Sequence, residues 1–115
     1  MPNKISYIEL PATGETGVEG MKQFYGEVMG WNFQELRPDY ASFHQAGIEG
    51  GLNGEPENRT AAPLVVLETD DLEAMMEKVV AAGGEITLDI FSYPGGRRFH
   101  FSDPGGNEMG VMQSA

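Results

Sequence analysis

Cysteine is absent from this chain of 115 residues, and basic residues are few. The absence of cysteine excludes disulfide bonds and thiolate metal sites, and a reducing cytoplasm is the compartment we expect. The 7 lysine and arginine residues stand against 18 acidic residues, for a formal net charge of −11. A field of this sign opposes nucleic acid, whose binding depends on a basic surface. It serves solubility, and it also favours the approach of a cationic ligand.

Long apolar runs are also missing. No stretch of about 18 apolar residues is present, so we expect no contact with a membrane, and the start of the chain lacks the pattern of a signal peptide. The length, with 40% hydrophobic residues, predicts one domain with a modest core. The glycine-rich runs lack the strand-then-helix context of a phosphate loop, which argues against nucleotide binding.

A repeated order of elements is present instead. In the first half, apolar periodicity predicts a strand, a helix and three strands, at 5–10, 18–29, 31–36, 40–45 and 48–53. A polar linker follows at 55–62. The second half repeats the order with a strand at 64–68, a helix ended by glycines 83–84, a strand at 86–91 and a hairpin within 94–112. Asp70 is expected to cap the second helix, with Glu73 completing a capping box.

Two landmarks support an internal duplication. Each predicted helix ends at glycine, and each third strand carries a Phe-His pair, Phe43-His44 and Phe99-His100. The sequence therefore predicts an α+β fold of two βαβββ modules, about 1–54 and 63–115, in a single domain covering 1–115. One such module buries its sheet poorly alone, so the two should pair, within one chain or across a dimer.

Two motifs give the chain a resemblance to the vicinal oxygen chelate superfamily, which includes glyoxalase I, the bleomycin-resistance proteins and the extradiol dioxygenases. Residues 24–31, FYGEVMGW, are similar to the helix end of that family, and residues 103–107, DPGGN, to its late turn. The chain looks closest to the short glyoxalase-like proteins. The resemblance implies paired modules that form a curved sheet around a cleft, and it implies a homodimer.

The resemblance also implies where a metal would bind. Metal-dependent members place one ligand on each of four strands, and carried onto this sequence these positions are Ser6, Gly50 or Gly51, Leu64 and Gly110. Divalent metals at such positions use imidazole or carboxylate, which none of these residues offers. We therefore expect no bound metal and no other cofactor.

A small, largely apolar set of residues is expected to line the cleft and contact a small-molecule ligand, as is usual for ligand sites. The set is Ser6, Ile8, Leu64, Val66, Gly110 and Met112.

Each of four polar residues has two interpretations: His100, Glu108, Arg97 and Arg98. His100 and Glu108 are candidates for acid/base catalysis and His100 for substrate contact, because imidazole titrates near neutrality. Alternatively they are an ordinary strand histidine and a solvated carboxylate. Arg98 or its neighbour Arg97 is expected to hold a carboxylate or phosphate, or else to pair with one of the acids of the chain. Glu9, on the opposite strand face from Ser6, is expected to have a structural role, either capping a helix or accepting a hydrogen bond.

Three functions follow from these expectations. The first is a glyoxalase-like protein of unassigned reaction that binds a small organic molecule in a metal-free cleft. The second is an enzyme of the superfamily, a lyase, isomerase or dioxygenase, which uses a divalent metal or acid/base residues. The third is a sequestering binder of a cationic drug, like the bleomycin-resistance proteins, with which the net charge agrees.

Overall fold

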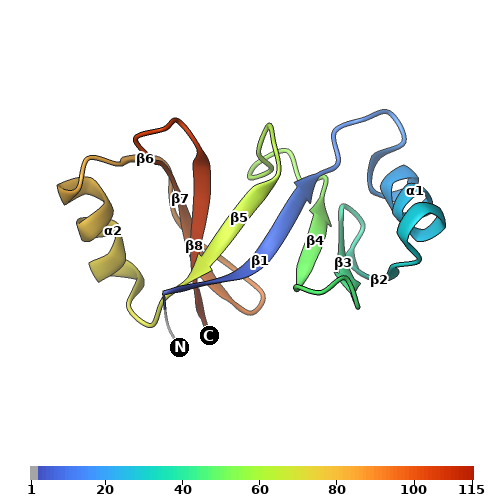
Figure 1. Ribbon diagram of the computed structural model, residues 1–115, viewed down its shortest axis with the longest axis horizontal. Helices are drawn as coiled ribbons and strands as arrows, with labels where there is room; N and C mark the ends of the chain where they lie inside the picture. Colours follow the sequence, from blue (N-terminus) through green and yellow to red (C-terminus); the bar gives the residue numbers. More distant parts are fainter. Residues whose placement is uncertain (1–2) are drawn as a thin grey trace. The chain divides into compact units, whose positions relative to one another are not determined.

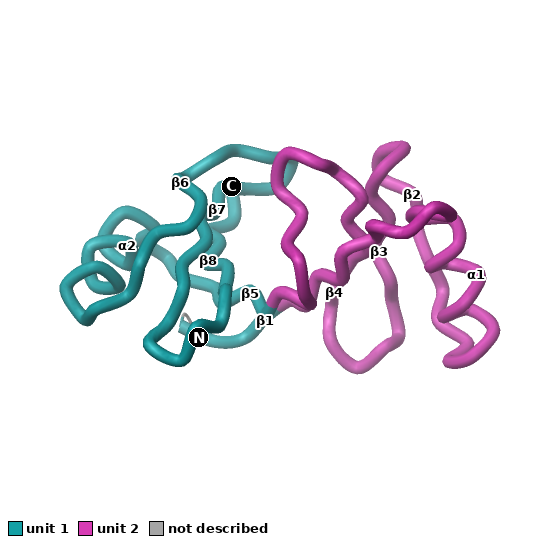
Figure 2. Tube along the Cα trace, turned by 90° about the horizontal axis from the view of Figure 1, so that it is seen from above, with its two compact units in different colours: residues 1–6, 65–115 teal, residues 7–64 magenta. Residues whose placement is uncertain are grey.

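The computed structural model describes residues 3–115 and contains two compact units (Figure 2). Unit 1 consists of the N-terminal segment up to Ser6 together with Val65–Ala115, and unit 2 consists of Tyr7–Leu64. No helix within residues 3–115 combines the length and apolar character needed to cross a membrane.

The elements follow one order twice, strand, helix and three strands (Figure 1). The first series is β1 (Lys4–Pro11), α1 (Gly17–Met29), β2 (Asn32–Arg37), β3 (Tyr40–His44) and β4 (Gly50–Asn53). The second series is β5 (Leu64–Glu68), α2 (Leu72–Ala81), β6 (Glu85–Tyr93), β7 (Gly96–Ser102) and β8 (Glu108–Ser114). The predicted α+β class and the two βαβββ modules are confirmed.

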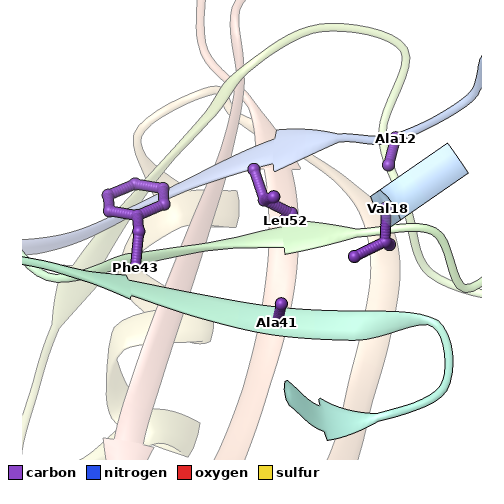
Figure 3. Packing of buried hydrophobic residues seen from close by; sticks show 5 residues of the cluster. All are labelled: Ala12, Val18, Ala41, Phe43 and Leu52. Carbon is purple, nitrogen blue, oxygen red and sulfur yellow. The ribbon is translucent and has the colours of Figure 1, made fainter. Parts of the chain in front are cut away.

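The strands of unit 2 follow the order β2-β3-β4-β1, in which β1 runs parallel to β4 and the other pairs are antiparallel. One face of these strands packs its apolar side chains against α1 (Figure 3). The buried residues of this core are Ala12, Val18, Ala41, Phe43 and Leu52.

An aromatic stack extends the core of unit 2 to the end of α1. Tyr25 stacks on Trp31 with ring centroids 5.1 Å apart, and Trp31 stacks on Phe43 at 4.9 Å. Gly30 ends the helix in the left-handed conformation, at φ 72°, which lets the chain turn back so that Trp31 reaches the core.

Side chains alternate along each strand, so the residues between the core positions point to the opposite face of the sheet. In unit 2 this opposite face is polar. Glu9 of β1 is only 2% exposed and accepts hydrogen bonds from the Tyr40 hydroxyl at 2.8 Å and from Asn53 Nδ2 at 2.9 Å. The hydroxyl of Tyr7 lies 2.6 Å from that of Tyr40. Of the two structural roles expected for Glu9, the hydrogen-bond acceptor is confirmed.

The strands of unit 1 follow the order β5-β8-β7-β6, and α2 packs on β6, β7 and β8. Leu72, Phe99 and Val111 are buried at this contact, with Met75 and Met76 of α2 packed against them. Phe99 is therefore buried in the core of unit 1, as Phe43 is buried in the core of unit 2. Its position confirms that the Phe-His pairs mark equivalent strands.

The helix cap of α2 differs from the prediction. Asp71 is the N-cap residue, and its Oδ1 accepts a hydrogen bond from the Ala74 backbone N–H at 3.1 Å. The prediction that Asp70 caps this helix is wrong. Asp70 and Asp71 carry the same carboxylate group, and the backbone conformation determines which of them lies within reach of the first turn. Glu73 points to β7 rather than completing a capping box, as described below.

The DPGGN turn joins β7 to β8. The Asp103 carboxylate accepts hydrogen bonds at 2.9 Å from the backbone N–H groups of Gly105 and Asn107. Hydrogen bonds from Asn107 lower the pKa of Asp103 below its ordinary value. The bond from the Asn107 backbone has the largest effect, and the bond from its side chain has the next largest. Gly106 takes the positive φ of 85° that the reversal requires. Asp103 therefore caps this turn through its side-chain oxygen.

Candidate functional site

Strand β7 presents two chemically different sides. On the side of α2, Arg97 forms a two-pronged ion pair with Glu73, at 2.6 and 3.2 Å, and Phe99 enters the core. The hydrogen bonds from Arg97 lower the pKa of the Glu73 carboxyl. Because side chains alternate along a strand, Arg98 and His100 lie on the side away from α2. For Arg97, the interpretation as an intramolecular ion pair is confirmed.

A histidine–carboxylate pair lies on that second side. His100 is 1% exposed, and its Nδ1 is 3.3 Å from Oε2 of Glu108 at the start of β8. The same Oε2 accepts a hydrogen bond from the Thr87 hydroxyl at 3.0 Å. The two candidate acid/base residues are therefore in contact. With the ring proton at Nδ1, directed at the carboxylate, Nε2 is the nitrogen that can accept a proton.

Aromatic rings from β6 stand beside Arg98. The guanidinium Cζ lies 5.2 Å from the ring centre of Phe91 and 5.6 Å from that of Tyr93, both within the range of cation–π attraction. Phe91 also meets His100 edge-on, with ring centres 6.0 Å apart. Arg98 is 6% exposed. These contacts hold the guanidinium and the imidazole in fixed positions along one strand.

Sheet register places several of the predicted ligand contacts beside this group. Gly110 of β8 is the partner of His100 on one side and of Val66 on the other. Met112 is the partner of Arg98.

The remaining predicted contacts are Ser6, Ile8 and Leu64. Ser6 belongs to the part of β1 that falls in unit 1, whereas Ile8 and Leu64 belong to unit 2. Alternation puts Ile8 on the same side of β1 as Leu10, which packs against the core, and opposite Glu9. Their role as ligand contacts stays a prediction.

Three contributors from β6 were missed by sequence reasoning: Thr87, Phe91 and Tyr93. A signal for two of them was present. Phe91 and Tyr93 are spaced by two residues just before a turn, and Phe91 pairs with Arg98 in the β6–β7 register. No such signal was present for Thr87. The register of β6 shifts on either side of Leu88, and strict alternation of side chains does not hold across such an irregular strand.

The residues present do not fit a divalent metal. Within residues 3–115 there is no group of three or more histidine, cysteine, aspartate or glutamate side chains that could hold one. Three protein ligands are the usual minimum for a catalytic zinc site. No chemical step at this site is therefore assigned to a metal.

Comparisons with known proteins give the family. The model of the Glyoxalase/Bleomycin resistance protein/Dioxygenase superfamily matches residues 16–111. The chain belongs to this superfamily. The resemblance predicted from the two sequence motifs is confirmed, and the βαβββ repeat is the glyoxalase-like fold.

One relative among known proteins shares low sequence identity with the chain. CFP32 of Mycobacterium bovis, a protein provisionally named a glyoxylase, is 23% identical over 95% of the chain. The chain spans about half of that relative, 45% of its length.

Several solved structures share the fold over nearly the whole chain, of which two serve as examples. A superfamily member from Vibrio splendidus 12B01 is 18% identical, with a TM-score of 0.69, and the match covers 97% of this chain and 99% of the other. A methylmalonyl-CoA epimerase from Streptomyces coelicolor is 15% identical, with a TM-score of 0.70, and covers 100% and 99%. At these identities the likeness shows the fold alone.

Proposed function

We propose that this member of the superfamily binds a small organic molecule without a divalent metal, on the side of unit 1 that carries Arg98 and His100. The observation that carries the proposal is the position of His100. This buried side chain lies with its Nδ1 3.3 Å from Oε2 of Glu108, and the ring of Phe91 lies beside it. Buried polar side chains held by specific partners among apolar neighbours are the usual character of a ligand site.

The charge on this side favours a ligand with a carboxylate or carbonyl oxygen. The Arg98 guanidinium, held against two aromatic rings, attracts an anionic or polarised oxygen. Aromatic neighbours add stacking area for a planar ligand. A cationic drug is the alternative suggested by the net charge of the whole chain. On this side it would meet the cation of Arg98, while the Glu108 carboxylate is already in contact with His100.

Ligand-observed NMR with matched pairs of compounds tests the proposal. Benzoate and related aryl carboxylates are compared with benzylamine and related aryl amines. We expect the carboxylates to bind, with affinity lost in Arg98→Met and partly kept in Arg98→Lys. Arg97→Met is the matched control, because Arg97 pairs with Glu73 on the opposite side. Binding of the amines alone, or equal binding by both methionine variants, would contradict the proposal.

The hydrogen bond between His100 and Glu108 favours a second function, acid/base catalysis as in a lyase or isomerase. A carboxylate that accepts the Nδ1 proton orients the imidazole and stabilises its protonated form, so that Nε2 can remove a proton from a bound molecule. Proton removal by His100 can be measured by NMR. A carboxylate compound with an acidic C–H is added in deuterated solvent, and the exchange of that hydrogen for deuterium is followed. We expect exchange to stop in His100→Gln. Exchange at the wild-type rate in that variant would exclude His100 as the base.

The proposal includes a homodimer. Phe24 and Val28 lie one helical turn apart on α1 and are 55% and 59% exposed, which leaves an apolar strip on this helix. Sedimentation of the wild type and of Phe24→Glu tests it. We expect a dimer that the charged variant dissociates, and a wild type that sediments as a monomer at all concentrations would contradict it.

A further inference from the structure

In unit 2, strand β3 carries a hydroxyl and an imidazole, and the loop between β3 and β4 adds a carboxylate. Oγ of Ser42 is 3.1 Å from Nε2 of His44, and Nδ1 of His44 is 3.8 Å from Oε1 of Glu49. Ser42 and His44 share the side of β3 opposite Phe43, which is buried in the core. This group lies in unit 2 and does not depend on the site described above.

The order of the three groups sets the direction of proton movement. A carboxylate facing Nδ1 favours the neutral ring that holds its proton there, and Nε2 then accepts the hydrogen bond from the Ser42 hydroxyl. A histidine placed in this way acts as the base that activates a serine, and the carboxylate orients it. At 3.8 Å, Glu49 is close enough to His44 for an ion pair but too far for a hydrogen bond, and the proposal requires this contact to shorten when substrate binds.

The surroundings of Ser42 suit a small substrate. Ser42 is 9% exposed, whereas the His44 side chain is 41% exposed, so the base is open to solvent and the hydroxyl is partly covered. The register partners of Ser42 are Gly51 on β4, which the hydroxyl groups of Tyr40 and Tyr7 cover, and Gln34 on β2. Directly paired residues present their side chains on one face, so the Gln34 amide can donate a hydrogen bond to an oxygen beside Ser42.

The chain after His44 is held in one conformation. Gln45 has a left-handed backbone, at φ 64°, which is uncommon for a residue with a side chain. Its side-chain oxygen accepts a hydrogen bond from Asn32 Nδ2 at 2.7 Å. This contact fixes the bend that leads from His44 to Glu49.

We propose that Ser42 and His44 hydrolyse small neutral acyl esters, with Glu49 positioning the imidazole. Oγ of Ser42 bonds to the ester carbonyl carbon while its proton passes to Nε2 of His44. The bond from that carbon to the alcohol oxygen breaks, and the imidazolium gives the proton to the departing oxygen. Water, deprotonated by His44, then attacks the acyl-serine. The carboxylic acid leaves, and the serine hydroxyl is restored.

Hydrolysis of p-nitrophenyl acetate by the whole chain tests the proposal. We expect Ser42→Ala and His44→Asn each to lower kcat by about 100-fold, the contribution of a positioned base. Glu49→Gln should lower kcat with KM unchanged, and Glu49→Asp should keep part of the rate. If Ser42→Ala hydrolyses the ester at the wild-type rate while His44→Asn does not, the imidazole acts alone and the proposal is wrong.

Covalent labelling supplies a measurement that does not depend on turnover. A fluorophosphonate probe should modify Ser42 and no other serine, as read by peptide mass spectrometry, and should fail in His44→Asn. Ser92→Ala is the matched control, since Ser92 is an exposed serine on β6 of the other unit. Labelling should be unchanged in this control. A wild-type protein that takes up no label at Ser42 would overturn the proposal.

Discussion

Tyr40 of β3 reaches across β4 to donate its hydroxyl hydrogen to Glu9 of β1, at 2.8 Å. It passes over Gly51, whose Cα lies beneath the hydroxyl groups of Tyr40 and Tyr7. A carboxylate 2% exposed is stable only when its oxygens are hydrogen-bonded, and Asn53 provides a second bond at 2.9 Å. The network therefore depends on the absence of a side chain at one position.

Gly51→Ala should destabilise the fold. A Cβ at this position would lie 2.5 Å from the Tyr40 hydroxyl oxygen and 2.6 Å from that of Tyr7, so the hydrogen-bonded rings would have to move. We expect a loss of about 1–3 kcal/mol in the free energy of unfolding, the usual cost of overpacking. Urea denaturation measures it. Gly14→Ala is the control, because a Cβ there meets no atom within 4 Å, and equal effects of the two would contradict the account.

Tyr40→Phe should change how stability depends on alkaline pH. Burial, then the charges of Glu9 and Tyr7, raise the pKa of Tyr40 well above its ordinary value. Above about pH 10 the unfolded chain loses this proton while the folded chain keeps it, so wild-type stability falls as pH rises. The steepest slope from one such group is about 1.4 kcal/mol per pH unit.

The variant should lack this part of the slope and lose about 1–3 kcal/mol at neutral pH, where a buried acceptor loses its donor. Urea midpoints between neutral pH and about pH 11 give both quantities. Tyr25→Phe is the control, because its ring stacks on Trp31 without help from the hydroxyl. Parallel pH profiles for wild type and Tyr40→Phe would show that another group causes the slope.

Asp71→Ala should cost about 1 kcal/mol of stability, because the first turn of α2 loses the oxygen that accepts from the Ala74 N–H. Asp70→Ala removes the same charge one residue earlier and should change stability by less than about 0.5 kcal/mol. Thermal unfolding of the two variants at one ionic strength makes the comparison. A larger loss for Asp70→Ala would reverse the assignment of the cap.

Metal removal should leave the protein unchanged. Because the described residues provide no three-ligand group, untagged protein should contain less than stoichiometric metal by elemental analysis. Its melting temperature should not respond to a chelator or to added Ni²⁺, Zn²⁺, Mn²⁺ or Fe²⁺. One equivalent of tightly held metal, with a rise in melting temperature, would refute the expectation.

The fold was predictable from the sequence because its signals are local and repeated. Gly30 ends the first helix, the Phe-His pairs mark equivalent strands, and the apolar periodicity separates helix from strand. Element ends were less certain. Strand β6 continues to Tyr93, two residues beyond the prediction, because pairing with β7 extends it.

The polar contacts were harder to predict. The sequence named His100 and Glu108 separately, but their 3.3 Å contact depends on the register between β7 and β8, which brings the start of one strand to the end of the other. The contact of Tyr40 with Glu9 spans 31 residues and crosses an intervening strand. Alternation gives the side on which a residue lies, but partners on that side follow only from the order and register of the strands.

The duplication has a practical consequence, since it left one imidazole in each unit. His44 and His100 are the 2 histidines of the chain, and they follow equivalent buried phenylalanines. Each ring faces a glutamate, Glu49 or Glu108, in its own half. In deuterated solvent the two Cε1 protons would give two resolved signals, one from each half of the molecule. Ligand binding on one half and acylation on the other could then be followed in the same unlabelled sample.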